Sequence, residues 1–287
     1  MGSQLAYTEP RGLVSNISEE PIGDSRVKIY HEELADTNRY LAREQGAGLE
    51  PREQQFRNML NAVKRFKTVD ASTKMIEVGT GTGWFPLLCQ LNGIPCQGLE
   101  ISPQLVKCAH EMGARYNVKP DIVLGNLEEA DLGRDHYDIV IASNVFEHVE
   151  HWQIGIQRVY EILKPGGLMF FESTNKWSFT SGEYTGFPTP YCYGWLPDSW
   201  RYSLRKTVQG DDIMKLGIDF HQFTHGRLRR EFRKVGFSKI YDRVEMANEE
   251  TITTGFRRAA VRWSRKNPLA KGLALTFCEA TRFMCVK

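Results

Sequence analysis

Seven short apolar runs are spread through the chain, and helix-compatible stretches separate most of them. The runs lie at 74–78, 97–100, 121–124, 139–142, 168–172, 237–244 and 282–286. Short strands that alternate with helices of this length are typical of βαβ units and a parallel sheet. The pattern therefore predicts an α/β fold with a doubly wound, seven-stranded sheet, and a ligand at the carboxyl ends of its strands.

A polar, helix-prone region precedes the first predicted strand. It runs from 30 to 66, is interrupted near Gly46 and resumes at Pro51, a residue suited to the first turn of a helix. We expect two helices here, within a helical N-terminal extension over 1–70 that precedes a main domain over 71–287.

An aromatic segment rich in Gly and Pro follows the fifth predicted strand. It covers 176–222 and is too long for a simple loop within a compact domain, so we predict an ordered cap over a substrate site. Regular structure is expected to resume at Thr224, which fits a helix N-cap, and that helix is expected to end at Gly236.

Composition narrows the classes of protein that fit. The chain has 287 residues, of which 41% are hydrophobic and 25% charged, as in ordinary globular proteins, and its net charge of +2 does not indicate a nucleic-acid partner. No apolar run reaches the roughly 18 residues that a membrane-spanning helix needs. The first residues lack the features of a secretory signal, so we expect a cytoplasmic protein whose six cysteines are reduced.

A glycine-rich turn follows the first predicted strand. Gly79, Gly81 and Gly83 would let the backbone approach a ligand closely. A dinucleotide fingerprint that starts at Gly79 would need Gly or Ala at position 84, where this chain has Trp84, so a nicotinamide-dependent oxidoreductase is disfavoured. Glu100 ends the next predicted strand, where an acidic side chain can accept hydrogen bonds from both ribose hydroxyls. Together these features predict a nucleoside site.

Five segments in the order of a known family strengthen this interpretation. They resemble motifs of class I S-adenosylmethionine-dependent methyltransferases, of the small-molecule type 11/12 kind and distantly similar to quinone-pathway O-methyltransferases. The segments are 77–83, Glu100, 125–127, 138–149 and 163–167. The resemblance implies a Rossmann-like domain, S-adenosyl-L-methionine as the cofactor and a small-molecule acceptor.

The first two motifs imply contacts to the methionine and ribose parts of the cofactor. Gly79 and Gly81 would face the methionine part, and Glu77 would support the loop or bind the amino group. Glu100 would hold the ribose, and Ile101 would pack on the adenine face.

The later motifs imply contacts to adenine and to the sulfonium. Asn126 and Leu127 would contact adenine, although many relatives have Asp where this chain has Asn126, and Asn144 would lie near the sulfonium. The segment from Asn144 to His148 resembles the Glu-x-x-Glu-His segment of quinone-pathway relatives, but Asn144 replaces its first Glu. We therefore predict no metal requirement.

Methyl transfer to a hydroxyl needs a base, and histidine exchanges protons near neutral pH. His148 is the first candidate because it follows a strand end that should face the site, and capping or packing of the next helix is its alternative role. His221 and His225 are second candidates, since the sequence from His221 to Phe237 resembles the segment after the cap in many small-molecule methyltransferases.

The cap suggests an apolar acceptor, aromatic or lipid-like, unless its rings only pack the cap onto the sheet. These rings belong to Trp177, Phe179, Tyr184, Phe187, Tyr191, Tyr193, Trp195, Trp200 and Tyr202. Transfer to a hydroxyl is the leading hypothesis, N- or C-methylation the nearest alternative, and a catalytically silent nucleoside-binding scaffold another.

The basic, partly apolar stretch 256–271 is either a peripheral contact to an anionic membrane or acidic partner, or a solvated helix before the last strand.

Overall fold

The computed structural model describes most of the chain after its first part. The described residues are 48–179, 193–197, 199–201, 203, 207, 221–250 and 252–287. The first helix expected before the sheet and the greater part of the predicted cap, including Tyr184, Phe187, Tyr191 and Tyr202, lie outside these residues.

A seven-stranded sheet forms the centre of the fold, as the apolar runs predicted. Its strand order is β3-β2-β1-β4-β5-β7-β6, with β7 antiparallel to both β5 and β6 and the other neighbouring pairs parallel. The strands are β1 (Met75–Val78), β2 (Cys96–Glu100), β3 (Asp121–Leu124), β4 (Tyr137–Ser143), β5 (Leu163–Thr174), β6 (Lys239–Asp242) and β7 (Ala280–Val286). The order reverses between β1 and β4, which is where doubly wound sheets bind their ligands.

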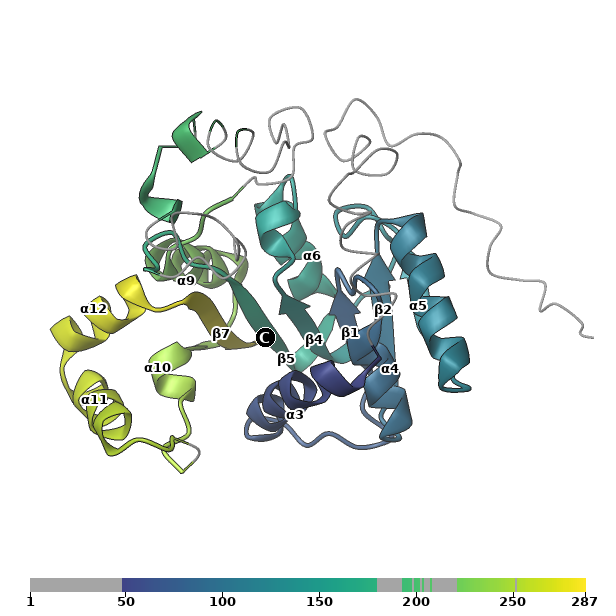
Figure 1. Ribbon diagram of the computed structural model, residues 1–287, viewed down its shortest axis with the longest axis horizontal. Coiled ribbons are helices and arrows are strands. Elements are labelled where there is room, and N and C mark those ends of the chain that lie inside the picture. Colours follow the sequence, from purple (N-terminus) through teal and green to yellow (C-terminus); the bar gives the residue numbers. More distant parts are fainter. Residues whose placement is uncertain are drawn as a thin grey trace, which may run out of the picture.

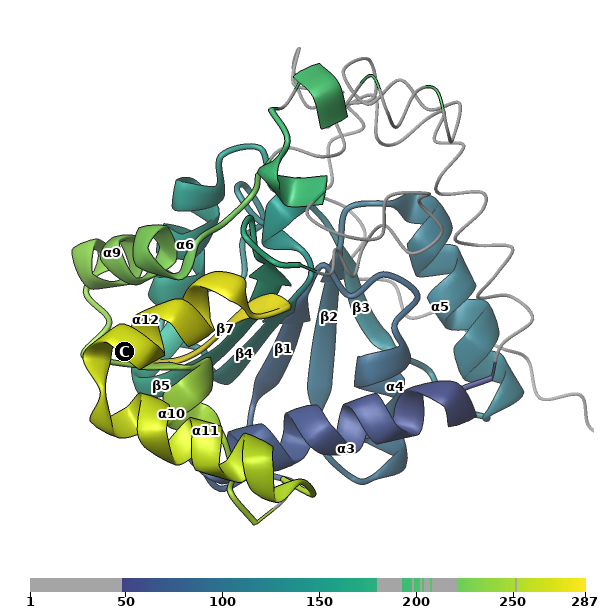
Figure 2. The ribbon, with the colours of Figure 1, turned by 60° about the vertical axis from the view of Figure 1, so that its left-hand side comes forward.

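Helices cover the sheet and extend beyond it (Figures 1 and 2). The helices that lie within the described residues are α3 (Glu50–Lys64), α4 (Trp84–Leu91), α5 (Pro103–Arg115), α6 (Trp152–Ile162), α9 (His225–Val235), α10 (Arg243–Met246), α11 (Gly255–Lys266) and α12 (Pro268–Phe277), with the 3-10 turns η1 (Phe146–His148) and η3 (Tyr193–Trp195). Figure 1 shows α5 on the β2 side of the sheet and α11 and α12 beyond the opposite edge, near β7. The second expected N-terminal helix is therefore present as α3.

Two hydrophobic cores lie on the two faces of the sheet because strand side chains alternate between the faces. Val140 of β4 packs in the core that α6 and α9 cover, whereas its neighbours Ile139 and Ile141 pack in the core that α3 and α4 cover. A sheet buried on both faces is the arrangement of a Rossmann-like fold. None of the described helices is long and apolar enough to cross a membrane.

The ends of α9 agree with the boundaries predicted from the sequence, whereas the end of β6 does not. Thr224 caps α9 as expected, because its hydroxyl accepts a hydrogen bond from the Arg227 N–H, and Gly236 ends the helix with φ of 117°. The strand predicted over 237–244 is shorter, since Asp242 begins α10 instead. Its carboxylate accepts from the N–H groups of residues 244 and 245, while Glu245 accepts from the Asp242 N–H, which is a capping box.

Candidate active site

The glycine-rich loop lies at the carboxyl end of β1, where the strand order reverses. Gly79, Gly81 and Gly83 all have positive φ values, of 65°, 58° and 69°. A Cβ atom on Gly79 would lie 2.1 Å from Cγ2 of Val145, which follows β4, and one on Gly83 would lie 2.8 Å from Cβ of Ala109. Glycine is therefore required by backbone conformation and by space, and the loop closely contacts the turn after β4.

Glu100 connects the end of β2 to this loop. Its carboxylate accepts hydrogen bonds from the backbone N–H groups of Gly81 (2.7 Å), Ile101 (2.9 Å) and Ser102 (3.0 Å). Burial raises the pKa of Glu100 to about 7, although these N–H groups act in the opposite direction. The carboxylate is thus fixed beside the loop at the position where the sequence predicted a ribose ligand.

Glu77 is a second buried carboxyl group at the loop. The Thr80 hydroxyl donates a hydrogen bond of 2.5 Å to it. Burial raises the pKa of Glu77 to about 8, the Thr80 hydrogen bond lowers it, and the nearby Glu100 charge raises it further. Two buried carboxyl groups therefore lie next to each other, and a cationic group bound between them would favour their ionised forms.

The raised pKa of Glu77 makes a prediction about stability. The pKa of Glu77 in the folded protein, about 8, exceeds the reference value of 4.5. The contribution of its protonated form to the free energy of unfolding is therefore fully present below pH 4.5 and is lost as the pH rises through 8. Glutamine does not titrate, so we expect the unfolding free energy of Glu77→Gln relative to wild type to increase by roughly 3 kcal/mol between pH 5 and pH 8. Urea unfolding at both pH values measures this.

The control for this prediction is Glu111→Gln, which changes an exposed carboxylate on α5. It should show the same difference from wild type at both pH values. An equally pH-independent difference for Glu77→Gln would contradict a raised pKa at that position.

The expected adenine contacts lie in the turn after β3. The Asn126 side-chain oxygen accepts a hydrogen bond from the Glu128 N–H at 3.1 Å, so the side chain shapes the turn itself. The Leu127 side chain is buried in the core beside α6. The structure thus brings this turn to the same edge of the sheet as Glu100, while both contacts to adenine stay predictions.

The turn after β4 brings further candidate residues to the loop. Asn144 is exposed, has φ of 52°, and donates a backbone hydrogen bond to the Glu172 carbonyl on β5. His148 is half-buried at the end of η1, close enough to Glu100 for a positive charge on its ring to lower the pKa of that carboxyl group. Asn144 and His148 therefore lie in the turn that contacts the glycine loop, while the roles of both residues stay predictions.

Glu147 holds this turn in place. It is fully buried and accepts a hydrogen bond of 2.6 Å from the Ser173 hydroxyl on β5. In the sequence Glu147 stands only within a segment that resembles a metal motif, and no local pattern marks Ser173 as its partner. Among the residues that the structure describes, no group of three or more His, Cys, Asp or Glu side chains is placed to hold a metal ion. The absence of a metal requirement stays a prediction.

The two remaining candidate bases, His221 and His225, occupy different surroundings. His221 lies against the turn after β4, since its backbone N–H donates to the Glu147 carbonyl and its Nε2 is 3.1 Å from the Glu150 carbonyl oxygen. His225 is 8% exposed and packs against Phe283 of β7, with ring centroids 5.2 Å apart. Burial, assisted by nearby arginines, lowers the pKa of His225 to about 4. The structure thus brings His148 and His221 to one turn and places His225 on the β7 side.

An aromatic cluster follows the carboxyl end of β5. Trp177 and Phe179 contact Trp195 with centroid distances of 5.8 and 5.4 Å, and Phe179 stacks on Phe277 of α12 at 5.1 Å. All four rings are partly exposed. The first three residues belong to the predicted cap aromatics. Phe277 was not predicted, because it is distant in sequence and reaches the cluster only through the position of α12.

A cavity of about 350 Å³ opens next to this cluster. Its lining residues are Asn175, Trp177, Thr224, His225, Gly226, Gly272, Leu275 and Thr276. The cavity lies between the end of β5, the start of α9 and α12. It is therefore at the β5 and β7 part of the sheet, whereas the glycine-rich loop follows β1.

Comparisons with known proteins agree with this geometry. A family described as "Methyltransferase domain" matches residues 52–242. The ubiquinone biosynthesis O-methyltransferase of Bradyrhizobium sp. (strain ORS 278) is 29% identical over 150 residues, which are 51% of this chain and 56% of that protein. The mitochondrial ubiquinone biosynthesis O-methyltransferase of Mus musculus is 48% identical over 112 residues, which are 36% of this chain and 29% of that protein. The matches thus span about half or less of these relatives.

Two solved structures show a similar fold. One is Haemonchus contortus phosphoethanolamine N-methyltransferase 2 in complex with S-adenosyl-L-methionine, with a TM-score of 0.52, 16% identity, and coverage of 79% of this chain and 51% of that chain. The other is an S-adenosylmethionine-dependent methyltransferase from Mesorhizobium loti, with a TM-score of 0.52, 18% identity, and coverage of 79% and 96%.

Proposed function

Since the chain belongs to the methyltransferase domain family, we propose that it transfers the methyl group of S-adenosylmethionine to a hydroxyl group of an aromatic or lipid-like small molecule. Family membership supports methyl transfer, and the resemblance of the glycine loop and Glu100 to class I motifs supports S-adenosylmethionine as the methyl donor. The choice of a hydroxyl acceptor rests on one observation, the similarity to O-methyltransferases of ubiquinone biosynthesis. The aromatic cluster beyond β5 supports an apolar acceptor, because exposed rings beside a site provide stacking surfaces.

The residues at the β1–β4 edge fit the cofactor. Gly79 and Gly83 allow the tight loop beside β1, because a Cβ atom at either position would collide with Val145 or Ala109. Glu100 presents a buried carboxylate for ribose hydroxyls, and Glu77 presents a buried carboxyl group that a bound ammonium group would ionise. When bound, S-adenosylmethionine supplies a methyl group on a positively charged sulfur. The protein then needs mainly to hold the acceptor in line with that methyl group, which lowers the entropic cost of the reaction.

A hydroxyl acceptor also has to lose its proton. We assign this proton to an imidazole nitrogen of His148, because η1 holds that ring near Glu100 in the turn that begins with the exposed Asn144 after β4. Glu147 and Ser173 position the turn through their buried hydrogen bond. His221 is the second candidate, and the buried His225 the third.

Product analysis tests the acceptor class. The purified protein is incubated with S-adenosylmethionine and a matched set of catechols, anilines and activated carbon acids, each with and without a prenyl tail, and products are identified by mass spectrometry. Methylated catechols support the proposal. Methylation restricted to the amines or the carbon acids would replace it with N- or C-methylation. Binding of S-adenosylhomocysteine without turnover on any compound would favour a silent scaffold.

Chelation provides a further prediction. Asn144 replaces a carboxylate in the segment that resembles the quinone-pathway motif, so we expect turnover in excess EDTA to equal turnover with added magnesium. A parallel assay with both additions controls for chelator effects on the acceptor. Loss of turnover in EDTA that magnesium restores would contradict this expectation.

A further inference from the structure

Helices α11 and α12 form a pair beyond the end of the sheet that contains β7 and β6 (Figures 1 and 2). They lie in the connection between α10 and β7, and they contact each other and α10. The strands β6 and β7 pair antiparallel, so a short hairpin would suffice to join them. The connection instead contains two helices that the sheet itself does not need.

These helices expose large apolar side chains, which an ordinary surface helix buries. Of their residues, all of which the structure describes, only Ser264 of α11 and Ala270 of α12 are buried. Large apolar side chains point outwards instead. The exposed fractions are 84% for Phe256, 62% for Trp263, 82% for Leu269 and 62% for Leu273. Helices of globular proteins normally bury their apolar stripe, so this surface fits a partner that is itself apolar.

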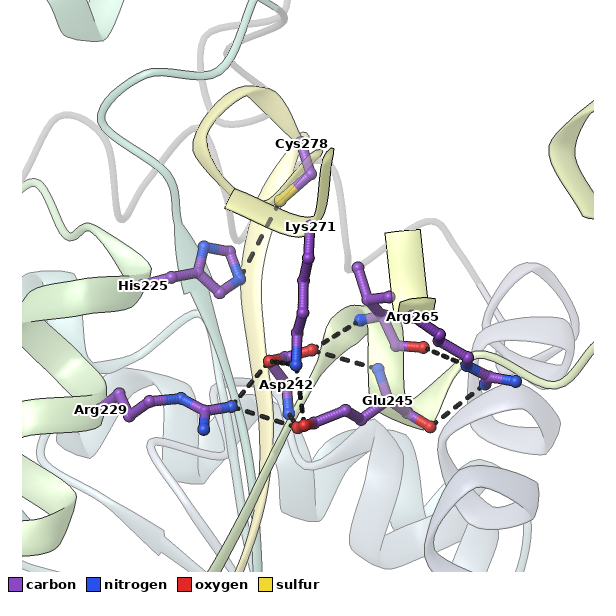
Figure 3. A network of polar contacts seen from close by, with 8 residues as sticks. His225, Arg229, Asp242, Glu245, Arg265, Lys271 and Cys278 are labelled. Atoms are coloured by element: carbon purple, nitrogen blue, oxygen red, sulfur yellow. Dashed lines mark hydrogen bonds and ion pairs between the residues drawn. The ribbon is translucent and has the colours of Figure 1, made fainter. Parts of the chain in front are cut away.

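The inner side of the pair is fixed by charges (Figure 3). Lys271 of α12 lies 2.8 Å from the Asp242 carboxylate and 2.7 Å from that of Glu245, and Arg229 of α9 contacts the same two carboxylates. Arg265 of α11 pairs with Glu249 at 2.8 Å and donates to backbone carbonyls after β6. Because the polar side is held against the body of the protein, the apolar side stays outside.

Basic side chains accompany the exposed apolar ones. The stretch 252–278 contains no Asp or Glu, whereas its six basic residues are Arg257, Arg258, Arg262, Arg265, Lys266 and Lys271. Arg257 and Lys266 are exposed and lie on the same helix as Phe256 and Trp263. An apolar stripe with basic side chains next to it is complementary to an interface of acyl chains and anionic headgroups.

The surface continues to the aromatic cluster beside β5. Phe277, at the end of α12, stacks on Phe179 with an interplanar angle of 24° and lies 5.9 Å from the Trp195 ring. The exposed helices and the rings that we assign to the acceptor side are thus joined by direct contacts.

We propose that α11 and α12 form a peripheral docking surface for an anionic lipid bilayer. Phe256, Trp263, Leu269 and Leu273 enter the headgroup region, while Arg257 and Lys266 contact anionic headgroups. A second copy of the chain fits this face less well. A two-fold interface would place the basic stretch of one copy against the same basic stretch of the other, and these like charges would repel each other. The inference goes beyond the proposed function and does not depend on methyl transfer, although it would bring a lipid-like acceptor close to the aromatic cluster.

Vesicle sedimentation of the full-length protein tests this proposal. Vesicles of phosphatidylcholine alone are compared with vesicles in which half of the lipid is phosphatidylglycerol, at low and high salt. We expect binding to the anionic vesicles at low salt and its weakening at high salt. Binding of S-adenosylhomocysteine is measured on the same samples, so that loss of the fold or of the cofactor site is detected separately.

Two variants distinguish the surface from general electrostatics. Arg257→Gln with Lys266→Gln should lower the partition coefficient by about 30-fold, because each basic residue near an anionic surface contributes about a fivefold factor. Trp263→Ser should lower it by about tenfold. The matched controls are Lys107→Gln with Lys119→Gln, which change the net charge equally, and Ile154→Ser, which removes an exposed apolar side chain of α6. We expect the controls to bind like wild type.

Three results would overturn the proposal. They are absence of binding to anionic vesicles at low salt, equal weakening in the control variants, and a dimer in analytical ultracentrifugation that Trp263→Ser dissociates while vesicle binding is unchanged. None of them alters the product analysis that tests methyl transfer, so the two proposals fail independently.

Discussion

We expect Glu100→Ala to lower the affinity for S-adenosylhomocysteine by about a hundredfold or more, because it removes an acceptor for two ribose hydroxyls at about 1.5–3 kcal/mol for each charged hydrogen bond. The substitution also frees the Gly81 N–H, which the carboxylate holds at 2.7 Å, and so loosens the glycine loop. Titration calorimetry at pH 8, above the pKa of Glu100 of about 7, measures the effect with the carboxylate ionised.

Two further variants separate the role of Glu100 in binding from its role in folding. Glu100→Gln keeps the shape and one acceptor oxygen, so we expect an intermediate affinity. Glu111→Ala removes an exposed carboxylate from α5 and should bind like wild type. Unchanged affinity in folded Glu100→Ala would show that the ribose is held elsewhere, and tight binding of NAD by wild type would return attention to an oxidoreductase.

The pH dependence of binding follows from the same two carboxyl groups. Burial raises the pKa of Glu77 to about 8 and that of Glu100 to about 7, so near neutral pH both are partly protonated. A carboxylate accepts hydrogen bonds and attracts an ammonium group better than a carboxylic acid does. Binding of the cofactor is therefore coupled to proton release, and the affinity should fall as the pH decreases through 8 and then 7, where Glu77 and then Glu100 become protonated.

The sheet could be predicted from the sequence because its signals are local. Each inner strand is a short apolar run followed by a turn or helix, and the glycine loop and Glu100 stand directly at strand ends. Parallel strands bring their carboxyl ends to one edge, so residues that follow β1, β2 and β4 meet there. The approach of Val145 to Gly79 is a physical consequence of this edge, and it explains why the loop needs glycine.

Features that depend on distant contacts could not be predicted in the same way. The strand expected over 237–244 ends early because Asp242 finds capping partners in α10 and cationic partners in α9 and α12. Likewise, the motif that contains His225 gives no sign that its ring packs against Phe283 rather than at the loop. The outward direction of Trp263 depends on charges that fix the opposite side of α11, which the helical period alone does not reveal.

The assignment of a base to the turn after β4 leads to the prediction with the largest effect on turnover. We expect His148→Ala to lower kcat by about a hundredfold to ten-thousandfold, the usual contribution of a positioned general base, while the affinity for S-adenosylhomocysteine changes little. The loss should shrink at high pH, where hydroxide can replace the base. Initial rates over a range of pH, together with calorimetry, measure both quantities.

The other histidines provide matched controls. His110→Ala, on the exposed side of α5, should leave kcat unchanged. His225→Ala should reduce the free energy of unfolding rather than kcat, because it removes a buried ring packed on β7. If His148→Ala instead lowers cofactor affinity and kcat equally, the residue shapes the turn that contacts the glycine loop, and His221 becomes the candidate base. This split matters because His148 lies near Glu100, so only separate measurement of binding and turnover distinguishes proton transfer from support of the cofactor site.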